Sequence, residues 1–240
     1  MKINGLQNLK FIKKINILLC ARKNDKYSIE LQNYLRKDKK NKISVILTDY
    51  KKKYSKLINN KIYKNEYNFI ILFRSHVIIK TEKLTKKTII LNLHPGPPKY
   101  RGIGCVNFAL LNNEIRYGST LHLVNNKIDH GSILNVQYFG IKKEISVEDV
   151  LDKTYKNLIK QAKKYLPNIF KDSNFLDVLK AKSKKDKWSK KIYRRKDLNS
   201  LYNLRNNLEK YNLENLLRAT VTKKFKPYLK TDKHKLILKY

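Results

Sequence analysis

An asparagine and a histidine stand on alternate residues at the end of an apolar run, in the stretch LNLHPGPPKYRG of residues 91–102. Side chains alternate along a β-strand, so Asn92 and His94 would point to the same side of a sheet if this run is a strand. Pro95, Pro97 and Pro98 follow at once. They fix the backbone and remove N–H donors, which favours a stiff loop over a helix. Such a loop would preorganise the histidine.

A carboxylate completes the set. Asp129 lies in the stretch NNKIDHG, between two further apolar runs. A carboxylate beside an imidazole can orient the ring or stabilise its protonated form, and an amide beside both can donate to a developing oxyanion. The three groups together suit an acyl-type transfer in which the substrate brings its own nucleophile, an amine. Taken alone, Asn-x-His at a strand end and Asp-x-Gly in a loop are both ordinary turn chemistry.

The elements that must position these groups alternate between strand and helix. Short isoleucine-rich runs predict buried strands at 15–20, 43–48, 67–73 and 88–94. A helix is predicted between the first two, with Ile29, Leu31, Tyr34 and Leu35 on one face. Strand, helix, strand at this spacing indicates a parallel α/β sheet, and open sheets of this kind bind ligands at the carboxyl ends of their strands.

The second half of the chain continues this domain and then changes character. We predict a helix in CVNFALLNN, an antiparallel strand pair at 119–124 and 133–139 with a turn at Gly131, and a long helix from Val147 to Phe170 capped by Ser146. The expected division is a catalytic domain over 1–182 and a small α+β appendage over 183–240. In the appendage we expect helices near 199–208 and 213–218 and a hairpin that turns at Thr231–His234.

Composition bounds the function less sharply. The 240 residues include 55 Lys and Arg against 19 Asp and Glu, a formal charge of +36. Such a charge suggests a polyanionic partner, but lysine is spread over nearly the whole length, so a general compositional bias explains it equally well. Cys20 and Cys105 form neither a disulfide framework nor a zinc spacing, which predicts a reducing cytoplasm and no metal. No apolar run is long enough for a membrane span.

The stretches LNLHPGPPKYRGIGCVNFALLNNE and YGSTLHLVNNKIDHGSIL resemble the folate-dependent formyltransferase family, which includes glycinamide ribonucleotide, methionyl-tRNA and sugar N-formyltransferases. An N-x-H-P run, a Y-R-G loop, a G-x-T strand and a D-x-G turn occur in the family's order. The resemblance covers roughly Ile15 to Pro167 and implies a Rossmann-like fold and 10-formyltetrahydrofolate as co-substrate. It also implies that Asn92, His94 and Asp129 are catalytic.

The resemblance assigns further residues to the site. The folate pocket would be walled by two segments, with the residues His76, Val77, Ile78, Asn125, Lys127 and Ile128. Thr120 and His122 would support the catalytic groups from the neighbouring strand, with a core histidine as the equal alternative for His122. His130 stands where the family commonly has threonine between the aspartate and the glycine.

The tail favours one branch of the family. About 55 residues follow Ser183, too few for the RNA-docking barrel of methionyl-tRNA formyltransferases, and they resemble the short tail of sugar-nucleotide N-formyltransferases. The turn CARKNDKYS lacks the glycines of a phosphate-cradling loop, which argues against glycinamide ribonucleotide. The predicted acceptor is a dTDP-, GDP- or UDP-linked 4-amino-4,6-dideoxyhexose used for surface polysaccharides such as lipopolysaccharide O-antigen. Its contacts are predicted at Lys99, Tyr100, Arg101, Arg194 and Arg195.

Other interpretations stay open at this point. The resemblance suggests a homodimer formed through the C-terminal hairpin. A methionyl-tRNA formyltransferase is one alternative function. Another is a basic RNA-binding protein on the same scaffold, because 16 tyrosines are interleaved with lysines as base stacking and phosphate binding would require.

Overall fold

The computed structural model describes residues 14–49, 59–64 and 66–238. These residues form two compact units, between which the chain passes several times. The first unit comprises the described residues up to His94, with Thr120–Val136 and Lys156–Asp186. The second comprises Pro95–Ser119, Gln137–Tyr155 and the chain from Lys187 onward. A domain boundary between residues 182 and 183 stays a prediction.

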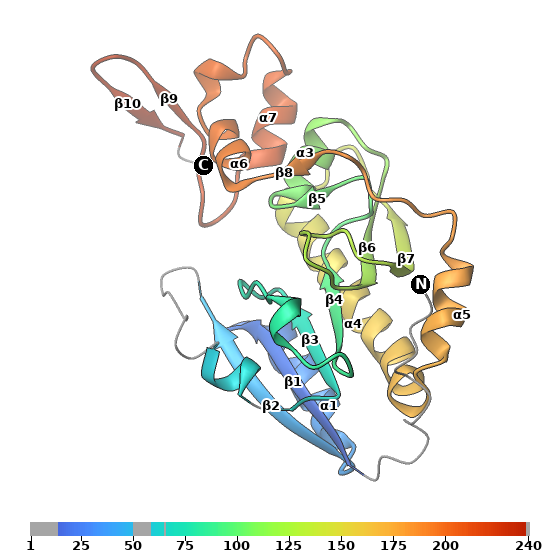
Figure 1. The fold of residues 1–240 in the computed structure, drawn as a ribbon. Helices are drawn as coiled ribbons and strands as arrows, with labels where there is room; N and C mark the ends of the chain where they lie inside the picture. The colour runs from blue at the N-terminus through green and yellow to red at the C-terminus, as the bar shows by residue number, and fades with distance from the viewer. Residues whose placement is uncertain (1–13, 50–58, 65, 239–240) are drawn as a thin grey trace. The chain divides into compact units, whose positions relative to one another are not determined.

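A six-stranded sheet has the order β2-β1-β3-β4-β6-β7 (Figure 1). β1 (Ile15–Arg22) pairs in parallel with β2 (Asn41–Thr48) and β3 (Phe69–Phe73), and β3 pairs in parallel with β4 (Ile89–His94). β6 (Arg116–Leu123) is antiparallel to β4. The prediction of an α/β fold with a mostly parallel sheet is confirmed. Three isoleucine-rich runs form β1, β3 and β4, whose residues are mostly buried, as expected for inner strands of a parallel sheet. The run at 43–48 forms β2, an edge strand with Leu47 39% exposed, so its prediction as a buried strand is wrong.

The strand pair that follows is also as predicted. The Leu123 amide donates to the Ser132 carbonyl over 2.9 Å, next to β7 (Ile133–Gly140). At the other end of the pair, a side-chain carbon added to Gly118 would lie 2.6 Å from the Gln137 carbonyl oxygen. Because Leu123 is opposite Ser132 and Gly118 is opposite Gln137, the two strands run antiparallel.

The first helix departs from the prediction in its buried face. α1 (Lys26–Lys37) is capped by Asp25, whose carboxylate accepts from the Ser28 amide over 2.8 Å. Leu31 and Leu35 are buried as expected, but Ile29 is 55% exposed and its assignment to the buried face is wrong. Residues two apart on an α-helix lie on nearly opposite sides, so Leu31 and Ile29 cannot share a face.

Two further helices follow β7. α4 (Val147–Lys171) begins as predicted, because the Ser146 hydroxyl accepts from the Asp149 amide over 3.1 Å. α5 (Phe175–Lys182) was not predicted, and the hydroxyl of Ser183 at its end donates to the Leu134 carbonyl over 2.9 Å. Among the helices of the described residues, none is both long and apolar enough to cross a membrane.

The second unit is built from short elements. They are β5 (Arg101–Gly102), α3 (Cys105–Leu111), β8 (Ile192–Tyr193), α6 (Arg195–Leu201), α7 (Leu213–Thr220), β9 (Tyr228–Lys230) and β10 (Lys235–Ile237). Single turns lie at Asn59–Tyr63 and Thr81–Lys83 in the first unit and at Leu204–Asn206 in the second. The hairpin of β9 and β10 is confirmed, since the Thr231 amide donates to the His234 carbonyl over 2.9 Å.

Packing in the second unit joins segments far apart in the sequence. The rings of Phe108 and Tyr193 stack with centroids 3.9 Å apart. The Asn107 side-chain amide donates to the Ala219 carbonyl over 2.6 Å, which ties α3 to α7. The helix expected near 199–208 is found earlier, as α6 followed by a single turn.

Candidate active site

The sheet gathers four polar side chains on one face of two neighbouring strands. In the antiparallel pairing of β4 with β6, Asn92 lies opposite His122 and His94 lies opposite Thr120. Directly opposed residues project from the same face, so these four side chains share one side of the sheet. His94, Thr120 and His122 are buried, whereas Asn92 is partly exposed.

The loop after β6 brings the carboxylate to this face. Asp129 has a φ of 42°, in the left-handed region that a non-glycine residue occupies only at a cost of about 1 kcal/mol or more. A side-chain carbon added to Gly131 would lie 1.8 Å from the Leu123 carbonyl oxygen. The loop can therefore fold back onto β6 only with glycine at 131, which gives the Asp-x-Gly pattern its physical reason.

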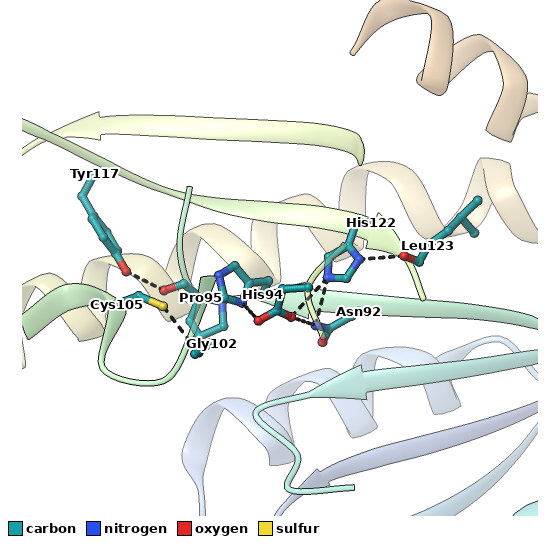
Figure 2. A network of polar contacts seen from close by, with 9 residues as sticks. Asn92, His94, Pro95, Gly102, Cys105, Tyr117, His122 and Leu123 are labelled. Atoms are coloured by element: carbon teal, nitrogen blue, oxygen red, sulfur yellow. Dashed lines mark hydrogen bonds and ion pairs between the residues drawn. The ribbon is translucent and has the colours of Figure 1, made fainter. Parts of the chain in front are cut away.

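The three predicted catalytic groups meet at this carboxylate, and Figure 2 labels Asn92, His94 and His122 of the cluster. Asp129 Oδ1 accepts from Asn92 Nδ2 over 3.2 Å, and Asp129 Oδ2 lies 3.4 Å from His94 Nδ1. His122 Nε2 lies 3.6 Å from Asp129 Oδ1. An amide, two imidazoles and a carboxylate thus form one cluster at the carboxyl end of β4.

The hydrogen bonds of His122 fix the orientation of Asn92. His122 Nδ1 lies 2.7 Å from the Leu123 carbonyl oxygen, which only accepts, so Nδ1 must carry a hydrogen (Figure 2). In the neutral ring Nε2 is then an acceptor, and it receives a hydrogen bond from Asn92 Nδ2 over 3.0 Å. The amide nitrogen of Asn92 is thereby directed toward both His122 and Asp129. His122 was predicted to support the catalytic groups from the neighbouring strand. Its contact with Asn92 fits that role, which stays a prediction.

The two segments predicted to wall the folate pocket are joined in the structure. The Thr81 hydroxyl donates to the side-chain oxygen of Asn126, and Val124 packs against the buried cluster that contains Val77. The large apolar side chains of Ile78 and Ile128 are 73% and 54% exposed. Each segment thus presents one large apolar side chain to solvent.

Polar backbone contacts hold these two segments. The amide of His76 donates to the Thr48 hydroxyl over 3.4 Å. The Asn125 side-chain oxygen accepts from the Lys127 amide over 3.0 Å, a local turn that fixes the second segment. Binding of folate by either segment stays a prediction.

The predicted acceptor contacts differ in accessibility. The Lys99 side chain is 66% exposed and pairs with Glu114, which also accepts from the buried Tyr100 hydroxyl over 2.7 Å. Arg101 is only 4% exposed, and its Nη1 donates to the Ser189 carbonyl over 2.7 Å. Arg101 thus joins its loop to the C-terminal segment, a role that the sequence did not suggest.

The remaining predicted cations lie at the surface. Arg194 and Arg195 are exposed at the start of α6, where the Arg194 amide donates to the Asp197 carboxylate over 2.7 Å. Phosphate contacts at Lys99, Arg101, Arg194 and Arg195 stay predictions.

Tyr117 is a site neighbour that the sequence analysis missed. Its hydroxyl donates to the Pro95 carbonyl over 2.8 Å, directly after the histidine (Figure 2). No local pattern could have indicated this contact, because the two residues are 22 positions apart.

A mostly parallel α/β sheet with an amide, an imidazole and a carboxylate at one strand end defines a class of ligand-binding α/β protein. Comparison with known families makes the assignment specific. A sequence model described as "Formyl transferase" matches residues 11–168. The chain belongs to the formyl transferase family, as its motifs predicted.

Individual relatives share shorter segments or the fold. A methionyl-tRNA formyltransferase from Finegoldia magna is 35% identical over 88 residues, 36% of this chain and 28% of that protein. A sugar N-formyltransferase from a Shewanella species superposes with a TM-score of 0.70 at 20% identity, covering 94% of this chain and 97% of the other. An N-formyltransferase from Helicobacter canadensis, solved with folinic acid and dTDP-3-aminofucose, gives a TM-score of 0.67 at 21% identity over 93% and 85% of the two chains.

The sequence matches cover only part of each relative, whereas the structural matches cover nearly the whole of this chain. The chain spans less than half the length of the curated relatives it matches by sequence. At about 20% identity, the structural likenesses concern the fold.

Proposed function

We propose that the protein transfers a formyl group from 10-formyltetrahydrofolate to the amine of a nucleotide-linked amino sugar. The observation that carries the proposal is the meeting of Asn92 and His94 at the carboxylate of Asp129, at 3.2 and 3.4 Å. Similarity to whole chains of sugar N-formyltransferases supports the choice of acceptor.

The residues of this cluster match the needs of the reaction. The acceptor amine attacks the formyl carbon, a new carbon–nitrogen bond forms, and the bond from that carbon to N10 of the donor breaks. Negative charge that develops on the formyl oxygen is stabilised by the Nε2–H of His94 and by one N–H of Asn92, which exchanges one of its two hydrogen bonds in the cluster for the oxyanion. Asp129 accepts the proton that the amine loses, directly or through water, and N10 of the leaving folate gains one.

The electrostatics of the cluster favour this division of roles. A carboxylate 3.4 Å from His94 Nδ1 stabilises a positive charge on that ring, and a charged imidazole is the better hydrogen-bond donor to an oxyanion. The Asn92 amide is oriented by His122 and Asp129 before any substrate binds.

The donor would be held between the two joined segments that carry Ile78 and Ile128. It supplies an activated one-carbon unit. The exposed apolar side chains of Ile78 and Ile128 would pack against its ring system. Asn125 and Lys127, whose turn is fixed by a hydrogen bond, would supply polar contacts at the rim.

The acceptor would be a dTDP-, GDP- or UDP-linked 4-amino-4,6-dideoxyhexose, with its diphosphate near the exposed cations Lys99, Arg194 and Arg195. Arginine forks pair well with phosphate oxygens. The proposal also places the enzyme in the cytoplasm, in the synthesis of surface polysaccharides. We further propose that it forms a homodimer through the β9–β10 hairpin. Methionyl-tRNA is the second candidate acceptor, favoured by the sequence match to methionyl-tRNA formyltransferase.

A panel of acceptors tests the proposal. Purified protein is incubated with 10-formyltetrahydrofolate and, separately, each nucleotide-linked amino sugar or initiator methionyl-tRNA, and release of tetrahydrofolate is followed. We expect saturable turnover with at least one sugar that is unchanged by added RNA. Transfer to tRNA alone would assign the second candidate, and RNA binding that weakens steeply with salt, without any turnover, would favour an RNA-binding protein.

A further inference from the structure

We propose that Tyr117 is a positioning residue for the catalytic histidine, acting through the carbonyl of Pro95. The inference rests on the proposed function for its kinetic test only. Its structural basis is a partly buried hydrogen bond of 2.8 Å from the Tyr117 hydroxyl to the carbonyl of Pro95, the residue that follows His94 in the chain (Figure 2).

The register of the sheet places Tyr117 where the chain leaves β4. His94 is the last residue of β4 and pairs with Thr120, whereas β6 starts earlier, at Arg116. The first residues of β6 therefore extend past the end of β4. Tyr117 lies in this extension, and its hydroxyl meets the first carbonyl beyond the catalytic strand.

Two constraints then fix the two backbone angles of Pro95, the residue after His94. The ring of Pro95 sets its φ near −65°, as in any proline. The hydrogen bond from Tyr117 holds the Pro95 carbonyl and thereby limits its ψ. The proline ring limits only φ and the hydrogen bond limits only ψ, so both are needed to fix the backbone at Pro95. A catalytic hydrogen-bond donor must be held to within about 0.5 Å of its productive position.

The environment of Tyr117 keeps this contact constant. Its side chain is fully buried, and its ring packs edge to face on Phe139 with centroids 6.1 Å apart. Burial raises the pKa of Tyr117 well above its ordinary value, so the hydroxyl keeps its proton throughout the assay range. Gly118, the next residue, has no room for a side chain because the Gln137 carbonyl lies too close. The strand can therefore shift little around the tyrosine.

Tyr117→Phe tests the inference because it removes only the hydroxyl. Thr154→Val is a control: the buried Thr154 lies in the same compact unit as Tyr117, and its hydroxyl donates to the Val150 carbonyl of its own helix over 2.7 Å. Both variants lose one hydroxyl hydrogen bond and should lose comparable thermal stability. Assays are run well below both melting temperatures.

We expect Tyr117→Phe to lower kcat about tenfold, with KM and the Kd for 5-formyltetrahydrofolate within about twofold of wild type. Thr154→Val should leave all three unchanged. Unchanged kcat in Tyr117→Phe, or equal kcat losses in both variants, would overturn the inference and indicate a merely structural tyrosine.

A second measurement works even if no acceptor is turned over. In protein labelled with ¹³C-histidine, the ring signal of His94 is assigned by its loss in His94→Gln. Tyr117→Phe should shift or broaden that signal, and Thr154→Val should not. An unmoved His94 signal in Tyr117→Phe would overturn the inference, whereas absence of turnover in the wild type with a moved signal would count against the proposed function alone.

Discussion

Replacing Asp129 by Asn removes the charge on which the cluster is centred and leaves its shape in place. Asparagine tolerates the left-handed backbone that Asp129 adopts, so the loop should survive the change. The new side chain can still accept one hydrogen bond from Asn92, but it can neither take up a proton nor stabilise a charged His94. The variant thus separates the chemistry of the carboxylate from its role in the fold.

The structure gives the size of the effect. Unit charges 3.4 Å apart, the distance from Asp129 Oδ2 to His94 Nδ1, interact by roughly 5 kcal/mol at an effective dielectric constant of about 20. The side chain is 10% exposed, so solvent screens this only in part. Since about 1.4 kcal/mol is a factor of ten, and loss of a general base costs about 10²- to 10⁴-fold, we expect kcat to fall by about a thousandfold.

The assay compares Asp129→Asn with Asp172→Asn, which removes a carboxylate from an exposed turn in the same unit. Turnover is measured with the acceptor found in the panel, and binding of 5-formyltetrahydrofolate is measured by titration calorimetry. Asp129→Asn should bind the folate normally and turn over slowly, and Asp172→Asn should resemble the wild type. Retention of kcat within about threefold in Asp129→Asn would refute the role of the carboxylate as proton acceptor.

Three further outcomes are expected. Gly131→Ala should lower both melting temperature and kcat, because its new carbon would lie 1.8 Å from the Leu123 carbonyl; wild-type values for both would contradict the close approach. Deleting residues 187–240 should abolish turnover although every catalytic group is retained, because the Ser189 amide donates to the Pro98 carbonyl and β8 pairs with β5; an active truncated protein would show that this support is dispensable. Burial raises the pKa of Cys20 to about 12, so in Cys105→Ser the native thiol should react slowly with a disulfide reagent, without the rise between pH 7 and 9 that an ordinary thiol shows.

Local patterns in the sequence determined the strands, most of the helices and the identity of the cluster. The isoleucine runs predicted β1, β3 and β4 because strands buried on both faces need continuous apolar side chains, and they also located β2, which is only partly buried at the edge of the sheet. The alternation of Asn92 and His94 and the turn at Asp129 can likewise be read from a few neighbouring residues. The assignment of Ile29 to the buried face was wrong because Ile29 lies two residues from Leu31, on nearly the opposite side of the helix.

Only the tertiary structure decided the partners of the buried polar groups. Arg101, whose contact with a phosphate stays a prediction, donates to the Ser189 carbonyl 88 residues away. Tyr117 carries no motif, yet its hydroxyl holds the carbonyl after His94. The residues from Lys187 onward share a compact unit with the loop that follows β4, and the domain boundary near residue 182 stays a prediction. Periodicity and turn chemistry act over a few residues, whereas a buried donor is satisfied by whichever acceptor the folded chain brings within reach.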